Sequence, residues 1–168
     1  TQHYVAPLCT PTRTGLLSGR FWSRFGVTKP QNPRALPQQT MTLPRALKTV
    51  GYRTCLVGKW HLGYESPNLP NDRGFDSFHG FLGDMMDNYE THLRGGKNWM
   101  RLNREEISPK GHATDLFTAW SVDELKRMHQ SGKPFFLYVA YNAPHDPIQP
   151  AQKWLQRKQK NNPELNEK

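Results

Sequence analysis

The chain has 168 residues and a formal net charge of +9 at neutral pH, from 23 lysines and arginines against 14 aspartates and glutamates. No apolar stretch reaches the roughly 20 residues that a membrane-spanning helix needs, and two cysteines are too few for a disulfide framework. The charge favours anionic partners such as nucleic acid, an anionic membrane surface or acidic small substrates, but it is spread along the chain and only supports other evidence.

The first predicted element is a short helix that begins beside Cys9. Thr10 is a favourable N-cap, Pro11 suits a first turn, and Gly19 suits the end of the helix. Cys9 would therefore sit at the amino end, where free N–H groups and the helix dipole favour anions. Residues 21–39 are rich in Pro, Gln and Asn and predict a loop.

Apolar residues recur at helical spacing over residues 42–50, and Gly51 is suited to end that helix. Residues 52–58 are short, apolar and bounded by turn residues, which predicts a buried strand with Cys55 as a small buried hydrophobe. Residues 64–110 show little periodicity and are rich in Gly, Asn, Asp and aromatics, so we expect them to line a binding region.

Helical spacing returns over residues 113–131, and residues 134–141 form the most strand-like segment of the chain. The order helix, strand, helix, strand predicts an α/β domain with a parallel sheet. Ligands of such sheets bind beyond the carboxyl ends of the strands, where Lys59, His61 and His145 would project.

Two separated motifs indicate the chemistry. The segment Cys9-Thr10-Pro11-Thr12-Arg13 has the form C-x-P-x-R, and the segment Gly58-Lys59-Trp60-His61-Leu62-Gly63 follows some distance later, after Gly51-Tyr52-Arg53-Thr54. Together they resemble both signature segments of the sulfatase family, in the correct order. Residues 73–76, 80–83 and 134–147 also fit the sulfatase pattern, and the resemblance extends to about residue 155. Thr12 departs from it, since sulfatases most often have Ser there, but the hydroxyl is kept.

The resemblance implies an alkaline-phosphatase-like fold, a three-layer α/β/α sandwich with a largely parallel sheet that is incomplete here. Residues 1–155 would form part of the sulfatase catalytic domain, and residues 156–168, which match no recognisable element, would be its polar, truncated continuation. The chain starts without an initiator Met, and we therefore expect it to be a piece of a longer protein.

The implied activity is that of a sulfuric ester hydrolase that cleaves sulfate monoesters. In the family, a formylglycine-generating enzyme oxidises the motif cysteine, here Cys9, to formylglycine. One hydroxyl of the hydrated aldehyde attacks sulfur to give a covalent sulfo-enzyme intermediate, and the second hydroxyl then expels sulfate.

Four further residues match family positions. Arg13 matches the arginine that contacts formylglycine, and Lys59 matches the lysine that binds sulfate and stabilises its charge. His61 matches the histidine that holds a formylglycine hydroxyl and takes its proton, and His145 matches the histidine that binds sulfate and protonates the leaving group. Taken alone, an Arg in the first turns of a helix is usually solvated, and a Lys after a strand is usually on the surface.

The family site also holds a divalent cation, usually Ca²⁺ with Mg²⁺ as the alternative, bound by oxygen ligands. Of the metal ligands, only Cys9 after conversion would come from this chain, because the carboxylate pair expected upstream and the Asp-Asn pair expected downstream are absent from it. We therefore expect residues 1–168 alone to be inactive. The implied partners are an aryl sulfate or a sulfated glycan, with no nucleic acid, and the implied location is periplasmic, secreted or lysosomal.

Other interpretations stay open. A phosphonate monoester or phosphodiester hydrolase of the same superfamily also uses formylglycine, although the Gly58–Gly63 segment favours sulfate. The positive charge and the missing metal ligands leave open a non-catalytic binder of sulfated glycans, and Cys9 could act as an unmodified thiol or be inert. The remaining histidines are expected to be structural or on the surface, namely His3, His79, His92, His112 and His129.

Overall fold

The computed structural model describes residues 4–30 and 36–162. His3, residues 31–35 of the predicted loop and residues 163–168 of the polar run lie outside the described residues. In chain order the elements are α1 (Cys9–Ser18), the 3₁₀ helix η1 (Trp22–Phe25), α2 (Leu43–Thr49), β1 (Arg53–Lys59), the 3₁₀ helix η2 (Pro70–Arg73), β2 (Ser77–Phe81), β3 (Leu93–Arg94), β4 (Lys97–Asn98), β5 (Met100–Leu102), β6 (Glu105–Glu106), α3 (Ala113–Gln130), β7 (Phe135–Ala140) and α4 (Gln152–Asn161).

The central sheet has the strand order β6-β5-β2-β1-β7. Strand β1 runs parallel to both β2 and β7, with Cys55 opposite Ser77 on one side and Leu137 on the other. Strand β5 pairs antiparallel with β2 and with β6. The α/β class is as predicted, but the sheet is mixed: β7 is parallel and follows helix α3, whereas β5 and β6 are antiparallel and are reached without a helical crossover.

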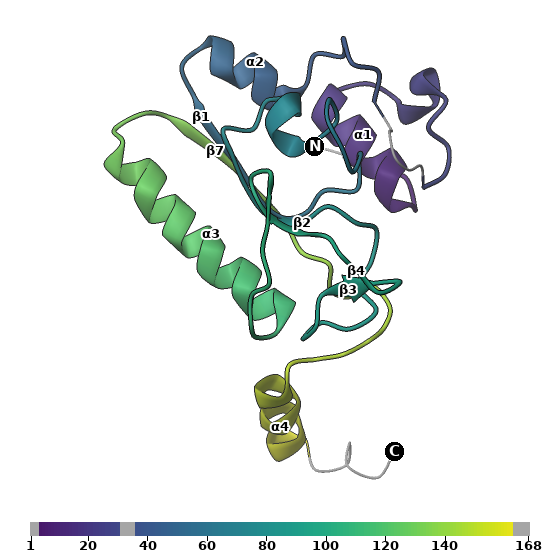
Figure 1. The fold of residues 1–168 in the computed structure, drawn as a ribbon, viewed down its shortest axis with the longest axis vertical. Coiled ribbons are helices and arrows are strands. Elements are labelled where there is room, and N and C mark those ends of the chain that lie inside the picture. The colour runs from purple at the N-terminus through teal and green to yellow at the C-terminus, as the bar shows by residue number, and fades with distance from the viewer. Residues whose placement is uncertain (1–3, 31–35, 163–168) are drawn as a thin grey trace.

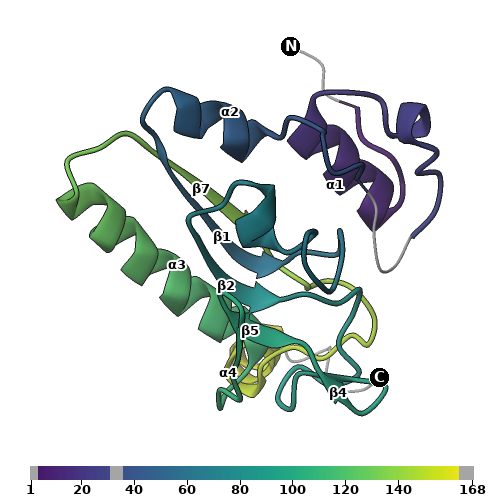
Figure 2. The same cartoon turned by 45° about the horizontal axis from the view of Figure 1, so that its top comes forward.

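Helices cover both faces of this sheet. In Figures 1 and 2, α3 lies along one face, and α1 and α2 lie on the other. Side chains of β1 alternate between the two sides: Leu56 packs in a cluster with Leu17 of α1, whereas Cys55 and Val57 pack in a cluster with Phe117 of α3. The three-layer α/β/α arrangement therefore follows from a strand that is apolar on both faces.

Two glycines allow the middle strands to approach closely at the end that carries the site. Gly58 has φ +104°, and a Cβ built on it would lie 2.1 Å from the carbonyl oxygen of Ala140 in β7. A Cβ on Gly80 in β2 would lie 2.1 Å from the carbonyl oxygen of Gly58. No other residue type fits at these positions without moving a neighbouring strand.

The first two helices were placed correctly, but details of both predictions were wrong. The residue before α1 is Leu8, and Thr10 is not its cap, because the Thr10 hydroxyl contacts His61 instead. The apolar residues of the predicted helix largely face outward: Leu43 in α2 and Val50 just after it are 37% and 67% exposed. Cys55 is fully buried, as expected.

Three further predictions need correction. Residues 64–110, expected to be irregular, contain β2 to β6. The loop predicted over residues 21–39 contains η1. The polar run from residue 156, expected to match no element, begins within α4. Helix α4 leads away from the sheet in Figure 1. Among the described residues, none of the helices is both long enough and apolar enough to cross a membrane.

Candidate active site

Cys9 occupies the first position of α1, at the helix end predicted from the sequence. Its side chain is half-buried, and its Sγ lies 3.1 Å from Nδ1 of His61. The first N–H groups of a helix lack partners within it, so this end of α1 favours negative charge beside residue 9.

Lys59 and His61 come from the carboxyl end of the central strand. Lys59 is the last residue of β1 and is 2% exposed, and His61 follows it in a fully buried position. The pairing of β1 with β2 continues past the strand ends, since the N–H of His61 donates to the carbonyl of Leu82 at 3.1 Å. His61 also has φ +55°, an uncommon conformation for a residue with a side chain. Strained backbone of this kind is frequent at functional sites.

Arg13 joins α1 to the same strand end. Its Nη1 donates to the carbonyl oxygen of Lys59 at 2.5 Å and to the hydroxyl of Tyr138 in β7 at 3.5 Å. Thr10 adds a second link, with its hydroxyl 3.3 Å from Nδ1 of His61. The structure thus brings together four of the five predicted residues, in two pairs that lie more than forty positions apart in sequence.

The charges of this cluster are unbalanced. Burial lowers the pKa of Lys59 to about 8, and the positive charge of Arg13 adds to that effect. Burial also lowers the pKa of His61 to about 3, with Lys59 acting in the same direction. At neutral pH the imidazole is therefore uncharged beside two cations, an arrangement that suits an anionic ligand.

One carboxylate, Asp84, acts on this cluster. Its charge raises the pKa values of both Lys59 and His61, against the effect of burial. The Asp84 carboxylate is itself held by Nε of Arg94 at 3.1 Å and by the N–H of Met85 at 2.8 Å. Sequence reasoning placed Asp84 and Arg94 in a binding region but did not pair them, because residues ten apart in an irregular segment give no periodic signal.

His145 stands to one side of the cluster. It lies on the loop after β7, its side chain is exposed, and its Nδ1 lies 3.0 Å from the carbonyl oxygen of Asp146. It contacts none of the other four predicted residues directly, although its charge still lowers the pKa of His61. A cavity of about 240 Å³ lies against it, lined mainly by apolar groups that include Pro144, Ile148 and Trp154.

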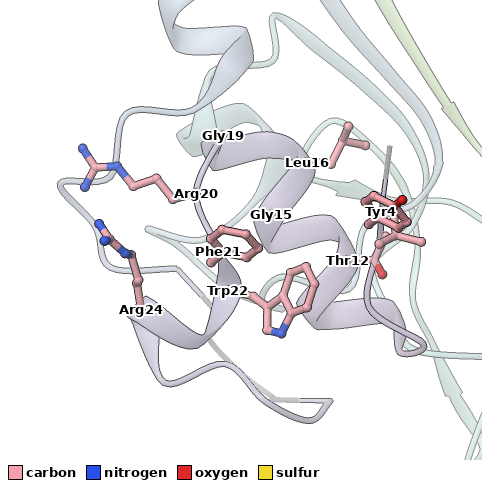
Figure 3. Close-up of a pocket in the computed structure, with 10 residues that line it drawn as sticks. Tyr4, Thr12, Gly15, Leu16, Gly19, Arg20, Phe21, Trp22 and Arg24 are labelled. Atoms are coloured by element: carbon pink, nitrogen blue, oxygen red, sulfur yellow. The ribbon is translucent and has the colours of Figure 1, made fainter. Parts of the chain in front are cut away.

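A larger cavity, of about 450 Å³, lies on the outer side of α1 (Figure 3). It is lined by Leu16, Phe21 and Trp22, with Arg20 and Arg24 at its edge. None of the five predicted residues lines it. The chemistry of Cys9 therefore does not belong to this cavity.

The described residues do not form a metal centre by themselves. Within residues 4–30 and 36–162, no group of three His, Cys, Asp or Glu side chains lies close enough together to hold a metal ion. Asp84, the carboxylate whose charge acts on Lys59 and His61, forms a salt bridge with Arg94. Cys9 as a metal ligand stays a prediction, and we assign no catalytic step to a metal.

Comparison with known proteins agrees with the motifs. The family model described as Sulfatase matches residues 1–168. Arylsulfatase J of Mus musculus is 37% identical over 159 residues, which cover 88% of this chain and 26% of that protein. N-acetylgalactosamine-6-sulfatase of Homo sapiens is 30% identical over 171 residues, which cover 89% of this chain and 33% of that protein. The chain thus spans about a quarter to a third of these relatives.

Solved structures show the same fold. The crystal structure of Ps i-CgsB in complex with k-i-k-neocarrahexaose has a TM-score of 0.79 and 28% identity, covering 90% of this chain and 38% of that one. The structure of BT4656 in complex with its substrate D-glucosamine-2-N,6-O-disulfate has a TM-score of 0.70 and 28% identity, covering 94% of this chain and 29% of that one. With the family model matching over the full length, the chain belongs to the sulfatase family.

Proposed function

We propose that the protein hydrolyses sulfate monoesters at the cluster formed by Cys9, Arg13, Lys59 and His61. The observation that carries this proposal is the contact between Cys9 Sγ and the uncharged imidazole of His61, at a helix amino end flanked by the buried Lys59 and the partly buried Arg13. A sulfate group brings the negative charge that this cluster lacks, so its binding would offset the cost of burying Lys59 and Arg13.

Residue 9 is the proposed source of the nucleophile. Oxidation of Cys9 to formylglycine would supply an aldehyde hydrate, with one hydroxyl to attack sulfur and a second to release sulfate. The position fits such a group, because the side chain of residue 9 is partly accessible while its reactive end meets His61 at 3.1 Å. A formylglycine-generating enzyme is the partner that this proposal requires.

His61 is the proposed proton acceptor for residue 9. An imidazole with a pKa near 3 keeps its acceptor nitrogen free at neutral pH, and Nδ1 already faces residue 9. The link from Thr10 fixes the ring in this orientation. The negative charge of a bound sulfate would raise the pKa of His61, so the fixed imidazole could then accept a hydroxyl proton as sulfate leaves.

Lys59 and Arg13 are the proposed electrostatic groups. With a pKa of about 8, the buried ammonium of Lys59 is mostly protonated at neutral pH and can stabilise charge that develops on sulfate oxygens. Arg13 keeps Lys59 in place by donating to its carbonyl oxygen. His145 follows β7, which runs parallel to β1, so it lies at the same edge of the sheet as Lys59. The Nε2–H of its imidazolium form would protonate the leaving alcohol.

The proposal is tested on the full-length protein, produced with a maturation enzyme. We expect turnover of an aryl sulfate that is lost in a Cys9→Ala variant and kept in a Cys55→Ala variant, which removes the buried thiol on the other side of β1. An aryl phosphodiester assayed in parallel separates the two formylglycine-dependent activities. Faster turnover of the phosphodiester would contradict the assignment to sulfate, and equal turnover by Cys9→Ala would contradict the role of Cys9.

A further inference from the structure

Tyr89 connects the loop that carries His145 to the body of the domain. The Tyr89 hydroxyl donates to the backbone carbonyl oxygen of His145 at 3.0 Å. Tyr89 is 2% exposed, and its ring stacks on that of His112, with centroids 5.3 Å apart and planes 22° apart. The hydroxyl is therefore held in a fixed position, which in turn fixes the backbone at His145.

The same pair of residues holds the loop a second time, at Gln149. The N–H of Tyr89 donates to Oε1 of Gln149 at 3.0 Å, and Nε2 of His112 donates to the carbonyl oxygen of Gln149 at 2.8 Å. The carbonyl of Tyr89 accepts from the N–H of Ala113, at the first residue of α3, at 2.8 Å. Two points of the loop, four residues apart, are thus fastened to the start of α3.

His145 depends on this support because little else fixes it. Its side chain is exposed, and its Nδ1 lies 3.0 Å from the carbonyl oxygen of Asp146. A carbonyl only accepts, so Nδ1 carries one hydrogen, and in the imidazolium form Nε2 carries the second, which it can give to the leaving alcohol. That contact orients the ring relative to its own loop, whereas Tyr89 and Gln149 hold the loop beside the start of α3.

We propose that Tyr89, with Gln149 and His112, is a positioning residue that sets the place of His145 for protonation of the leaving alcohol. This inference rests on the proposed function, in which His145 supplies that proton. Tyr89, His112, His145 and Gln149 all line the cavity of about 240 Å³, so the supporting residues and the general acid share one surface.

The inference makes a prediction that a purely structural role does not. A misplaced general acid slows the release of poor leaving groups and hardly affects an acidic phenol, whereas partial unfolding slows every substrate equally. We therefore expect Tyr89→Phe, which keeps the stacked ring and removes the hydroxyl, to change the dependence of turnover on leaving-group acidity.

The experiment compares kcat of the full-length, matured protein on a series of aryl sulfates from 4-nitrophenyl to 4-methoxyphenyl sulfate. Tyr89→Phe should lose about tenfold on the least acidic phenol and about twofold or less on 4-nitrophenol. Gln149→Met removes the other side-chain contact and should change the series in the same direction. Tyr141→Phe is the matched control, because it removes, from the loop that carries His145, a tyrosine hydroxyl that contacts Thr118, at 2.9 Å, and not the backbone of His145.

The outcomes separate the two proposals. If the wild-type protein cleaves the series but Tyr89→Phe and Gln149→Met lose equally on every ester, or lose nothing, the positioning role is wrong and the proposed function stands. If residue 9 is converted and the wild-type protein cleaves no sulfate ester, the proposed function is wrong and this inference falls with it. Unfolding midpoints of the variants, measured against Tyr141→Phe, identify any loss that comes from folding.

Discussion

Replacing Gly58 by alanine tests how the central strand places Lys59. An alanine at φ +104° costs about 1–2 kcal/mol in backbone strain. Its Cβ would also lie 2.1 Å from the carbonyl oxygen of Ala140, so β1 and β7 would have to separate, which adds about 1–3 kcal/mol. We therefore expect Gly58→Ala to lower the free energy of unfolding by about 2–5 kcal/mol.

Gly51→Ala is the matched control for this substitution. Gly51 has φ +85°, yet a Cβ built there has no neighbouring atom within 4 Å, so it should show the strain without the clash, about 1–2 kcal/mol. Urea or thermal unfolding of both variants of the full-length protein gives the comparison. Equal losses for the two alanines would show that the close approach of β1 to β7 is wrong.

Three other predictions follow from individual side chains. Burial lowers the pKa of His79 to about 4, below its unfolded value near 6.5, so the unfolded chain binds a proton that the folded chain does not, and up to about 3 kcal/mol of stability is lost as pH falls from 6.5 to 4. His79→Phe should therefore weaken the dependence of the free energy of unfolding on pH over that range. An unchanged dependence would disprove the argument. Lys59→Met should reduce kcat about 10²–10³-fold, because it removes a charge that faces the substrate. The unfolding midpoint should not fall, because the charge that is removed is buried, and a marked drop in the midpoint would indicate a structural role. Because burial raises the pKa of Cys55 to about 12, iodoacetamide should label only Cys9 in folded, unmatured protein and both thiols after unfolding, and early labelling of Cys55 would contradict its buried position.

The parts of the fold that sequence predicted well are those with local signals. Pro11 and Gly19 mark the two ends of α1, and the apolar run around Cys55 gives β1. Strand β2 and the hairpin formed by β5 and β6 were missed, because they are two to five residues long and are stabilised by pairing with distant segments. Local propensity carries no information about such partners.

The candidate site was predicted through motifs and completed by tertiary contacts. Cys9 and His61 belong to separate motifs, and nothing in their spacing shows that Sγ and Nδ1 meet at 3.1 Å. Thr10 was expected to cap α1, but it contacts His61 because the strand end lies directly beside the helix. The support of His145 by Tyr89 joins residues 56 positions apart and has no sequence signal.

Conversion of Cys9 to formylglycine is the central claim, and mass spectrometry of the alkylated, digested full-length protein tests it most directly. After production with a maturation enzyme, the peptide that contains Cys9 should carry an aldehyde and resist alkylation, while the peptide that contains Cys55 should be alkylated in the same sample. An alkylated, unmodified Cys9 in protein that hydrolyses aryl sulfates would contradict the account.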